Sequence, residues 1–223
     1  MKVFPKTNMR SFALWLATGL VLASTSCSKN EEVVAPTISN EALTTVQLTL
    51  TNTANASDVV TGQWEQLLNS NGTPLTPDVS KANLTLKPNA TYSGTLVLLD
   101  KTQSPVFVVS DEIRERANYH HFFYQPLPTT QTLGIPAPTG TDTYPTPIPN
   151  PLPTTGNLAL TVALTDKDTN NPPLPLGLTT TMTTGAASTG YLRVVLRHQP
   201  NSKDGTYAPG STDLDVGFNV KIQ

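Results

Sequence analysis

The chain has 223 residues, a net charge of −2 and charged side chains at only 13% of its positions. This balance excludes the basic surface that nucleic-acid binding needs, so no nucleic-acid partner is expected. The single cysteine excludes an internal disulfide. The composition, rich in threonine and proline, favours strands and turns over helices.

The first 26 residues have the organisation of a secretory signal peptide. Three basic residues lead into the apolar run 12–23, which is too short to span a bilayer because spanning takes about 20 apolar residues. Cys27, the only cysteine, follows directly, and acylation of its thiol and of the new N-terminus explains its position. The segment resembles a bacterial lipoprotein signal, although Ser24 replaces the usual leucine. The alternative is a soluble exported protein, cleaved nearby, with a free thiol.

Residues 27–42 predict a flexible tether between the cysteine and the folded part. The acidic stretch 28–32 resembles the signals that follow the cysteine in Bacteroidetes lipoproteins exported to the cell surface. Two or more acyl chains anchor a protein firmly where one does not. We therefore expect palmitate and related acyl chains on Cys27 to hold the protein on the outer membrane of the cell envelope, on its periplasmic or its surface face.

Apolar and polar residues alternate through most of residues 43–223, as they do in half-buried strands. Short strands separated by turn signals, without repeated helices, predict an all-β fold. We expect an immunoglobulin-like β-sandwich of about eight to ten strands, with one short helix and one long Pro/Thr-rich loop. The expected strands are 43–50, 59–68, 82–86, 91–99, 119–124, 157–164, 178–184, 191–198 and 214–222.

The long loop is the segment 125–156, which holds nine of the 20 prolines and no charged residue except Asp142. Proline lacks the amide hydrogen that a sheet needs, and a stretch of this composition cannot bury a core. We interpret the segment as a disordered insertion in a single domain that spans residues 43–223.

Charge, histidine and aromatic rings converge in residues 111–124. Ser110 or Asp111 is predicted to cap a short helix there, because a side-chain oxygen accepts a free amide of the first turn. After Asn118 the pattern changes to that of a strand. His120 and His121 are then expected on opposite faces, an arrangement that does not suit one shared metal ion.

One hypothesis makes these residues a metal site. Carboxylate and imidazole ligands suit zinc and similar ions, so the candidate ligand or metal site consists of Glu112, Glu115, His120 and His198. Their spacing matches no tight metal motif. The favoured alternative is that the glutamates form a solvated helix face and that the histidines make ordinary hydrogen bonds.

A second hypothesis concerns calcium. Asp166, Asp168 and Asn170 place oxygen atoms at alternate positions, as the start of a calcium loop does. Such a loop also needs glycine at its sixth position and glutamate at its twelfth, where this chain has Asn171 and Gly177. A polar hairpin turn is the favoured alternative.

Three neighbouring aromatic residues, Phe122, Phe123 and Tyr124, are candidates for a binding groove, with burial in the core as the favoured alternative. The chain contains no Gly-x-Ser-x-Gly elbow and no paired acid and base motif. We therefore expect a protein that is not an enzyme and that uses no cofactor.

Several short stretches carry a resemblance to a known family. They are 43–50, 112–113, His120 with 122–124, 166–168, 183–187 and 196–200. They are similar to those of Bacteroidetes lipoproteins of unknown function, some of which are labelled type 1 periplasmic binding fold superfamily proteins. That labelled fold is α/β, whereas the pattern here is all-β. In the relatives glutamine follows the first histidine, so the resemblance favours His120 over His121 as the residue with a shared role.

These features predict a lipid-anchored envelope protein that is a binding or accessory module for an unidentified ligand or partner. One concrete form is a partner of an outer-membrane protein such as a transporter. The alternatives are a metal-binding protein or metal-dependent enzyme that uses His120, His198 and Glu112, and a surface adhesion or structural module.

Overall fold

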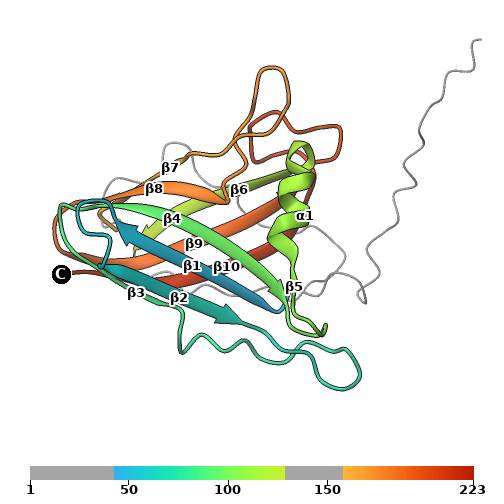
Figure 1. The fold of residues 1–223 in the computed structure, drawn as a ribbon, viewed down its shortest axis with the longest axis horizontal. Coiled ribbons are helices and arrows are strands. Elements are labelled where there is room, and N and C mark those ends of the chain that lie inside the picture. Colours follow the sequence, from blue (N-terminus) through green and yellow to red (C-terminus); the bar gives the residue numbers. More distant parts are fainter. Residues whose placement is uncertain (1–42, 129–157) are drawn as a thin grey trace, which may run out of the picture. The chain divides into compact units, whose positions relative to one another are not determined.

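The computed structural model describes residues 43–128 and 158–223 (Figure 1). The predicted signal peptide, Cys27, the predicted tether and residues 129–156 of the predicted insertion lie outside the described residues, as does residue 157. Within the two described ranges, no helix combines the length and the apolar character that crossing a membrane would require.

The first sheet is antiparallel throughout and has the strand order β2-β1-β4-β8-β7, with the short strand β5 also paired to β4. Its strands are β1 (Thr45–Asn52), β2 (Val59–Glu65), β4 (Thr91–Asp100), β5 (Phe107–Val108), β7 (Leu160–Leu164) and β8 (Thr179–Thr184).

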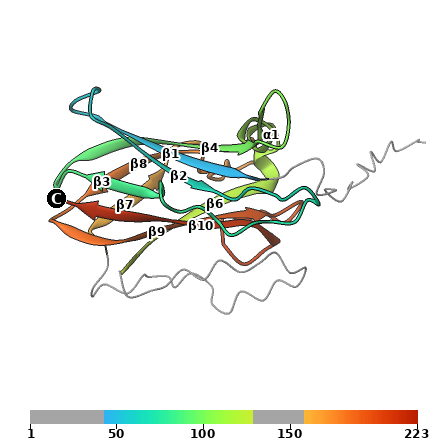
Figure 2. The same ribbon diagram turned by 90° about the horizontal axis from the view of Figure 1, so that it is seen from below.

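The second sheet has the order β3-β10-β9-β6, and β3 is the one strand among those described that pairs in parallel, with β10. Its strands are β3 (Asn83–Leu86), β6 (His120–Pro128), β9 (Ser188–His198) and β10 (Ser211–Ile222). Figure 2 shows the two sheets as separate layers. The predicted all-β sandwich with one short α-helix is therefore confirmed.

The core lies between the sheets and follows the period of two that strands impose on their side chains. In β10 every second residue is buried, and the five are Leu214, Val216, Phe218, Val220 and Ile222. In β4 the same alternation buries Leu96 and Leu98 and leaves Val97 and Leu99 partly exposed. The apolar run in β4 is therefore buried mainly on one face.

The helix differs from its prediction at its start. Helix α1 spans Val109–Glu115 and is followed by one turn of 3-10 helix, η1 (Ala117–Tyr119). No side chain caps α1, so the predicted capping role of Ser110 or Asp111 is wrong. β5 ends directly before α1, so the helix begins two residues earlier, and the buried Ser110 Oγ accepts the Leu98 amide at 3.4 Å instead.

Strand β6 also continues further than predicted. It reaches Pro128, four residues into the segment interpreted as an insertion, and Gln125 and Leu127 are buried within it. β6 lies at the edge of its sheet and pairs only with β9, and an edge strand tolerates proline because one side of it needs no amide donors. The prolines therefore do not end the strand.

Candidate functional site

Three segments meet where β6 begins and β9 ends. They are the turn after α1, the connection between β7 and β8, and the connection between β9 and β10, which lie together near α1 in Figure 1. We call residues 116–124, 165–178 and 197–210 the loop cluster. Hydrogen bonds join its three segments, including Gln199 N–H to the Tyr119 carbonyl (2.6 Å) and Thr169 N–H to the Asn118 side chain (3.0 Å).

His120 and His198 are partners in the register of β6 and β9, and their rings stack with centroids 4.9 Å apart and planes 12° from parallel. His120 Nδ1 lies 3.0 Å from the Arg116 carbonyl, so this nitrogen carries a proton and donates it. Burial lowers the pKa of His120 to about 4, and the positive charges of Arg116 and Lys203 act in the same direction. The ring is therefore neutral at pH 7.

His121 faces away from the His120–His198 stack, as predicted, and packs on Phe123 with ring centroids 4.1 Å apart. Tyr207 meets Phe123 edge-on at 5.2 Å. Burial also lowers the pKa of His121 to about 4, with the Lys203 charge as the next contribution. Its Nδ1 is buried without a hydrogen-bond partner in the described part of the chain.

The four residues of the metal hypothesis are only partly brought together. His120 and His198 are in contact, whereas Glu112 and Glu115 are on α1 and Glu115 is exposed. Across residues 43–128 and 158–223, no group of three or more His, Cys, Asp or Glu side chains is arranged to hold a metal ion. The alternative of ordinary hydrogen bonding fits His120, which bonds to the backbone.

A buried ion pair holds the three segments of the loop cluster together. Lys203 Nζ lies 2.8 Å from Asp168 Oδ2, and these side chains are only 1% and 0% exposed. Lys203 also donates to the Ala117 carbonyl at 2.9 Å, so one ammonium joins all three segments. Burial lowers the pKa of Lys203 although Asp168 opposes this. Burial alone would raise the pKa of Asp168, but hydrogen bonds from Lys203, Leu174 and Asn170 outweigh it and lower the pKa.

The residues of the calcium hypothesis form a hydrogen-bonded turn. Asp168 Oδ1 accepts the amides of Asn170 (3.0 Å) and Leu174 (2.8 Å). The Asp166 carboxylate accepts three successive amides, those of residues 177–179, at 2.7, 2.9 and 3.2 Å. Both carboxylates are thus bonded to donors of the protein. This geometry favours the hairpin-turn interpretation over the calcium hypothesis.

Two of the three candidate binding aromatics have structural roles. Phe122 is fully buried in the core. The Tyr124 hydroxyl donates to the Gly177 carbonyl at 2.7 Å, and burial raises the pKa of this tyrosine. Phe123 is partly exposed beside His121 and Tyr207. Burial in the core, the favoured alternative, therefore fits Phe122, whereas the groove stays a prediction for Phe123 and Tyr124.

Sequence reasoning missed the role of Arg197. Arg197 lies in β9 and is only 5% exposed, although arginine is a residue type that is rarely buried. Its guanidinium lies 4.8 Å from the centre of the Tyr207 ring and donates to Thr212 Oγ1 (2.5 Å) and to the Gly210 carbonyl (2.6 Å). A buried arginine needs such partners. No local signal pairs it with Tyr207, ten positions later in a loop.

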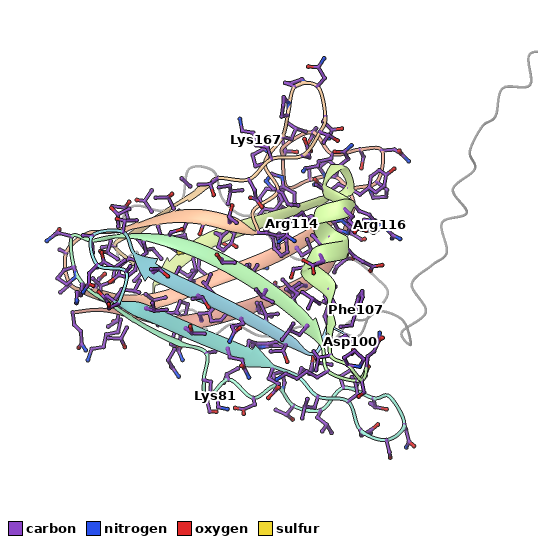
Figure 3. The ribbon with its side chains drawn as sticks, in the orientation of Figure 1. Lys81, Asp100, Phe107, Arg114, Arg116 and Lys167 are labelled. Atoms are coloured by element: carbon purple, nitrogen blue, oxygen red, sulfur yellow. The ribbon has the colours of Figure 1, made fainter. Side chains whose placement is uncertain are left out.

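A second feature lies where the chain joins the sandwich. We call residues 66–75 and 101–106, with Thr44 between them, the N-terminal surface. The Gln66 amide donates to the Thr44 carbonyl (2.7 Å), and the Lys101 amide donates to Thr44 Oγ1 (2.8 Å). A cleft of about 730 Å³ lies here, with Leu67 among its lining residues. Figure 3 shows Asp100 at the end of β4, where the turn of this surface begins.

The Asp166 and Asp168 carboxylates and the Lys203 ammonium are bonded to one another or to the backbone, which suits a rigid support better than acid–base chemistry. At the N-terminal surface, Lys101 pairs with Glu65. A scan against protein-family models, a search of curated proteins and a search of solved structures found no match to this chain.

Proposed function

We propose that this protein is a lipid-anchored, non-catalytic module of the cell envelope that binds a partner or ligand at the outer membrane. The observation that carries the proposal is Cys27, the only cysteine, placed directly after a basic start and a short apolar run. A double acyl anchor on this residue would hold the protein firmly. The resemblance to Bacteroidetes lipoproteins supports the same conclusion.

The loop cluster supports a role without catalysis. A general acid or base needs a pKa near the working pH and access to a substrate proton. Asp168 and Lys203 are buried against each other, and the two buried histidines are neutral at pH 7 with pKa values of about 4. These groups stabilise the connections between strands. An accessory role beside an outer-membrane transporter is the concrete form that we favour.

The anchor is tested by growing cells with an alkyne-bearing palmitate and detecting label on the immunoprecipitated protein. We expect label on the wild type, none on Cys27→Ser, and full label on a matched Ser28→Ala variant. Membrane fractionation should follow the label. Equal label on wild type and Cys27→Ser, or none on either while a control lipoprotein is labelled, would refute the proposal.

A further inference from the structure

Large apolar side chains that remain exposed are concentrated beside the N-terminal surface. Of the six in the described residues, three lie within this surface, and two more, Val79 and Val108, lie within four positions of it in the sequence. Leu67 and Leu75 are each 47% exposed and Val106 is 48% exposed. The sixth, Val59, is 51% exposed and pairs with Thr51, at the opposite end of β1 and β2. Single exposed apolar residues are ordinary, but a group of them marks a contact surface.

The two leucines are held side by side on an ordered loop. The Leu75 amide donates to the Leu67 carbonyl at 2.8 Å, and the Asn69 amide donates to the Thr73 carbonyl at 2.9 Å. The Asn69 side chain also accepts the amides of Asn71 and Thr73, each at 2.9 Å, which fixes the tip of the loop. The loop therefore presents both leucines in one arrangement and needs little further ordering to bind.

The chain between Cys27 and the sandwich reaches the molecule at this surface. Leu43 lies only 16 positions after Cys27, so a short length of chain joins the proposed anchor to the described fold. Thr44 contacts the leucine loop through Gln66 and the β4–β5 turn through Lys101. An anchor at Cys27 therefore makes the N-terminal surface the part of the sandwich nearest to the lipid along the chain, at an effective concentration on the order of millimolar.

We infer that the N-terminal surface is a membrane-contact face, on which Leu67 and Leu75 rest among the headgroups of the lipid layer that carries the Cys27 acyl group. This inference rests on the proposed lipid anchor. Contact by apolar side chains sets the orientation of the sandwich, with the Val59 end directed away from the lipid. Because Lys101 is already paired with Glu65, the contact depends on apolar burial and is little affected by salt.

The test uses the single cysteine. Mature chain, residues 27–223, is coupled through Cys27 to a maleimide-bearing lipid in vesicles of phosphatidylethanolamine and phosphatidylglycerol, and a control sample has Cys27 blocked with free maleimide. Hydroxyl-radical footprinting then measures the exposure of individual side chains. We expect Leu67 and Leu75 to lose at least about half of their reactivity on vesicles, with Val59 unchanged and the protection retained at high salt.

Variants separate lipid contact from other causes. Leu67→Asp/Leu75→Asp should abolish the protection of Val106 on vesicles, whereas Val59→Asp, matched in chemistry and exposure, should leave it intact. Equal footprints for coupled and blocked protein, or equal protection at Val59, would overturn the inference. Protection that requires envelope protein added to the vesicles would overturn it in favour of a protein partner. Chemical coupling replaces acylation by the cell, so the two tests are independent. A negative footprint would not affect the palmitate result, and a negative palmitate result would not affect the footprint.

Discussion

The loop cluster and the N-terminal surface depart from the usual distribution of side chains in opposite ways. The loop cluster buries charged and polar groups, with Lys203 and Asp168 almost completely hidden. The N-terminal surface exposes apolar groups, with Leu67 and Leu75 each about half in water. Buried charges cost free energy unless they are paired, whereas exposed leucines cost little until something covers them. We conclude that the first region maintains the fold, whereas the second is the surface for which we propose a contact.

The largest expected effect is a loss of stability at low pH that comes from the loop cluster and not from the N-terminal surface. The pKa values of His120 and His121 are about 4 in the folded protein because burial favours the neutral ring, against an ordinary value of 6.5. The unfolded chain therefore binds protons between about pH 6.5 and pH 4 that the folded chain excludes. The contribution of the neutral rings to the free energy of unfolding is therefore fully present above about pH 6.5. It falls as the pH is lowered toward 4, by up to about 3 kcal/mol for each ring.

Urea unfolding at about pH 7 and about pH 5 measures this loss. At the N-terminal surface, the hydrogen bond from Lys101 lowers the pKa of Glu65 below its usual 4.5, so this pair is lost only at lower pH. His121→Phe should remove a large share of the loss between these two pH values, whereas Glu65→Gln should leave it unchanged. If His121→Phe lost as much stability between these pH values as the wild type, burial of His121 would not be a cause of the pH dependence.

Next in size is the loss of a lysine from each region. Lys203→Met leaves the buried Asp168 without its cation and should lower the free energy of unfolding by about 3 kcal/mol. Lys101→Met breaks a pair whose side chains are 31% and 20% exposed, and should cost at most about 1 kcal/mol. Chemical denaturation at pH 7 measures both. Equal losses of unfolding free energy in the two variants would show that the Lys203–Asp168 pair does not hold the loop cluster together.

A third comparison uses one glycine from each region. Gly177 has φ +100° and Gly72 has φ +74°, both in the left-handed range. A Cβ on Gly177 would lie 2.8 Å from Phe122 Cβ, whereas nothing lies within 4 Å of one on Gly72. We expect Gly177→Ala to cost about 2–3 kcal/mol and Gly72→Ala about 1 kcal/mol. Thermal unfolding would separate them, and a larger shift for Gly72→Ala would contradict the contacts around Gly177.

The smallest expected effect concerns the exposed leucines themselves. Leu67→Asp and Leu75→Asp should each change the free energy of unfolding by less than about 0.5 kcal/mol, because substitutions at exposed sites seldom matter to the fold. The measurement is again denaturation of the protein free in solution. A loss of several kcal/mol would mean that these leucines support the loop, and the contrast between the two regions would disappear.

The strands could be predicted well where apolar and polar residues alternate, because every second side chain of a strand faces the core. The alternation from Leu214 to Ile222 became β10 with all five apolar residues buried. The period of a strand is a local property, so local reasoning finds it. The start of α1 was missed because β5, through its pairing with β4, decides where the helix can begin, and no residue near Ser110 reports that pairing.

The candidate site was harder to predict, because its contacts join residues far apart in the sequence. The pairing of Lys203 with Asp168 spans 35 positions between two polar loops, and neither loop has a period that indicates burial. The short spacing of Asp166 and Asp168 instead resembled a calcium loop. Carboxylate oxygen atoms are needed both to bind a cation and to accept backbone amides in a turn. His120 and His198 were correctly grouped, because the register of β6 and β9 brings their rings together. Within the described residues no third acidic, histidine or cysteine side chain completes a metal site with them.

The position of β10 also determines the order in which the protein can fold. β10 lies between β3 and β9, pairs Ile222 with Leu86 across 136 positions, and follows every other strand that the structure describes. Until β10 is available, β3 has no partner in its sheet and the apolar face of β9 lacks its neighbour. Such late, long-range pairing slows folding and leaves strand edges open. The export that we propose for this protein would benefit from the delay, because the chain cannot complete its second sheet until β10 has crossed the membrane.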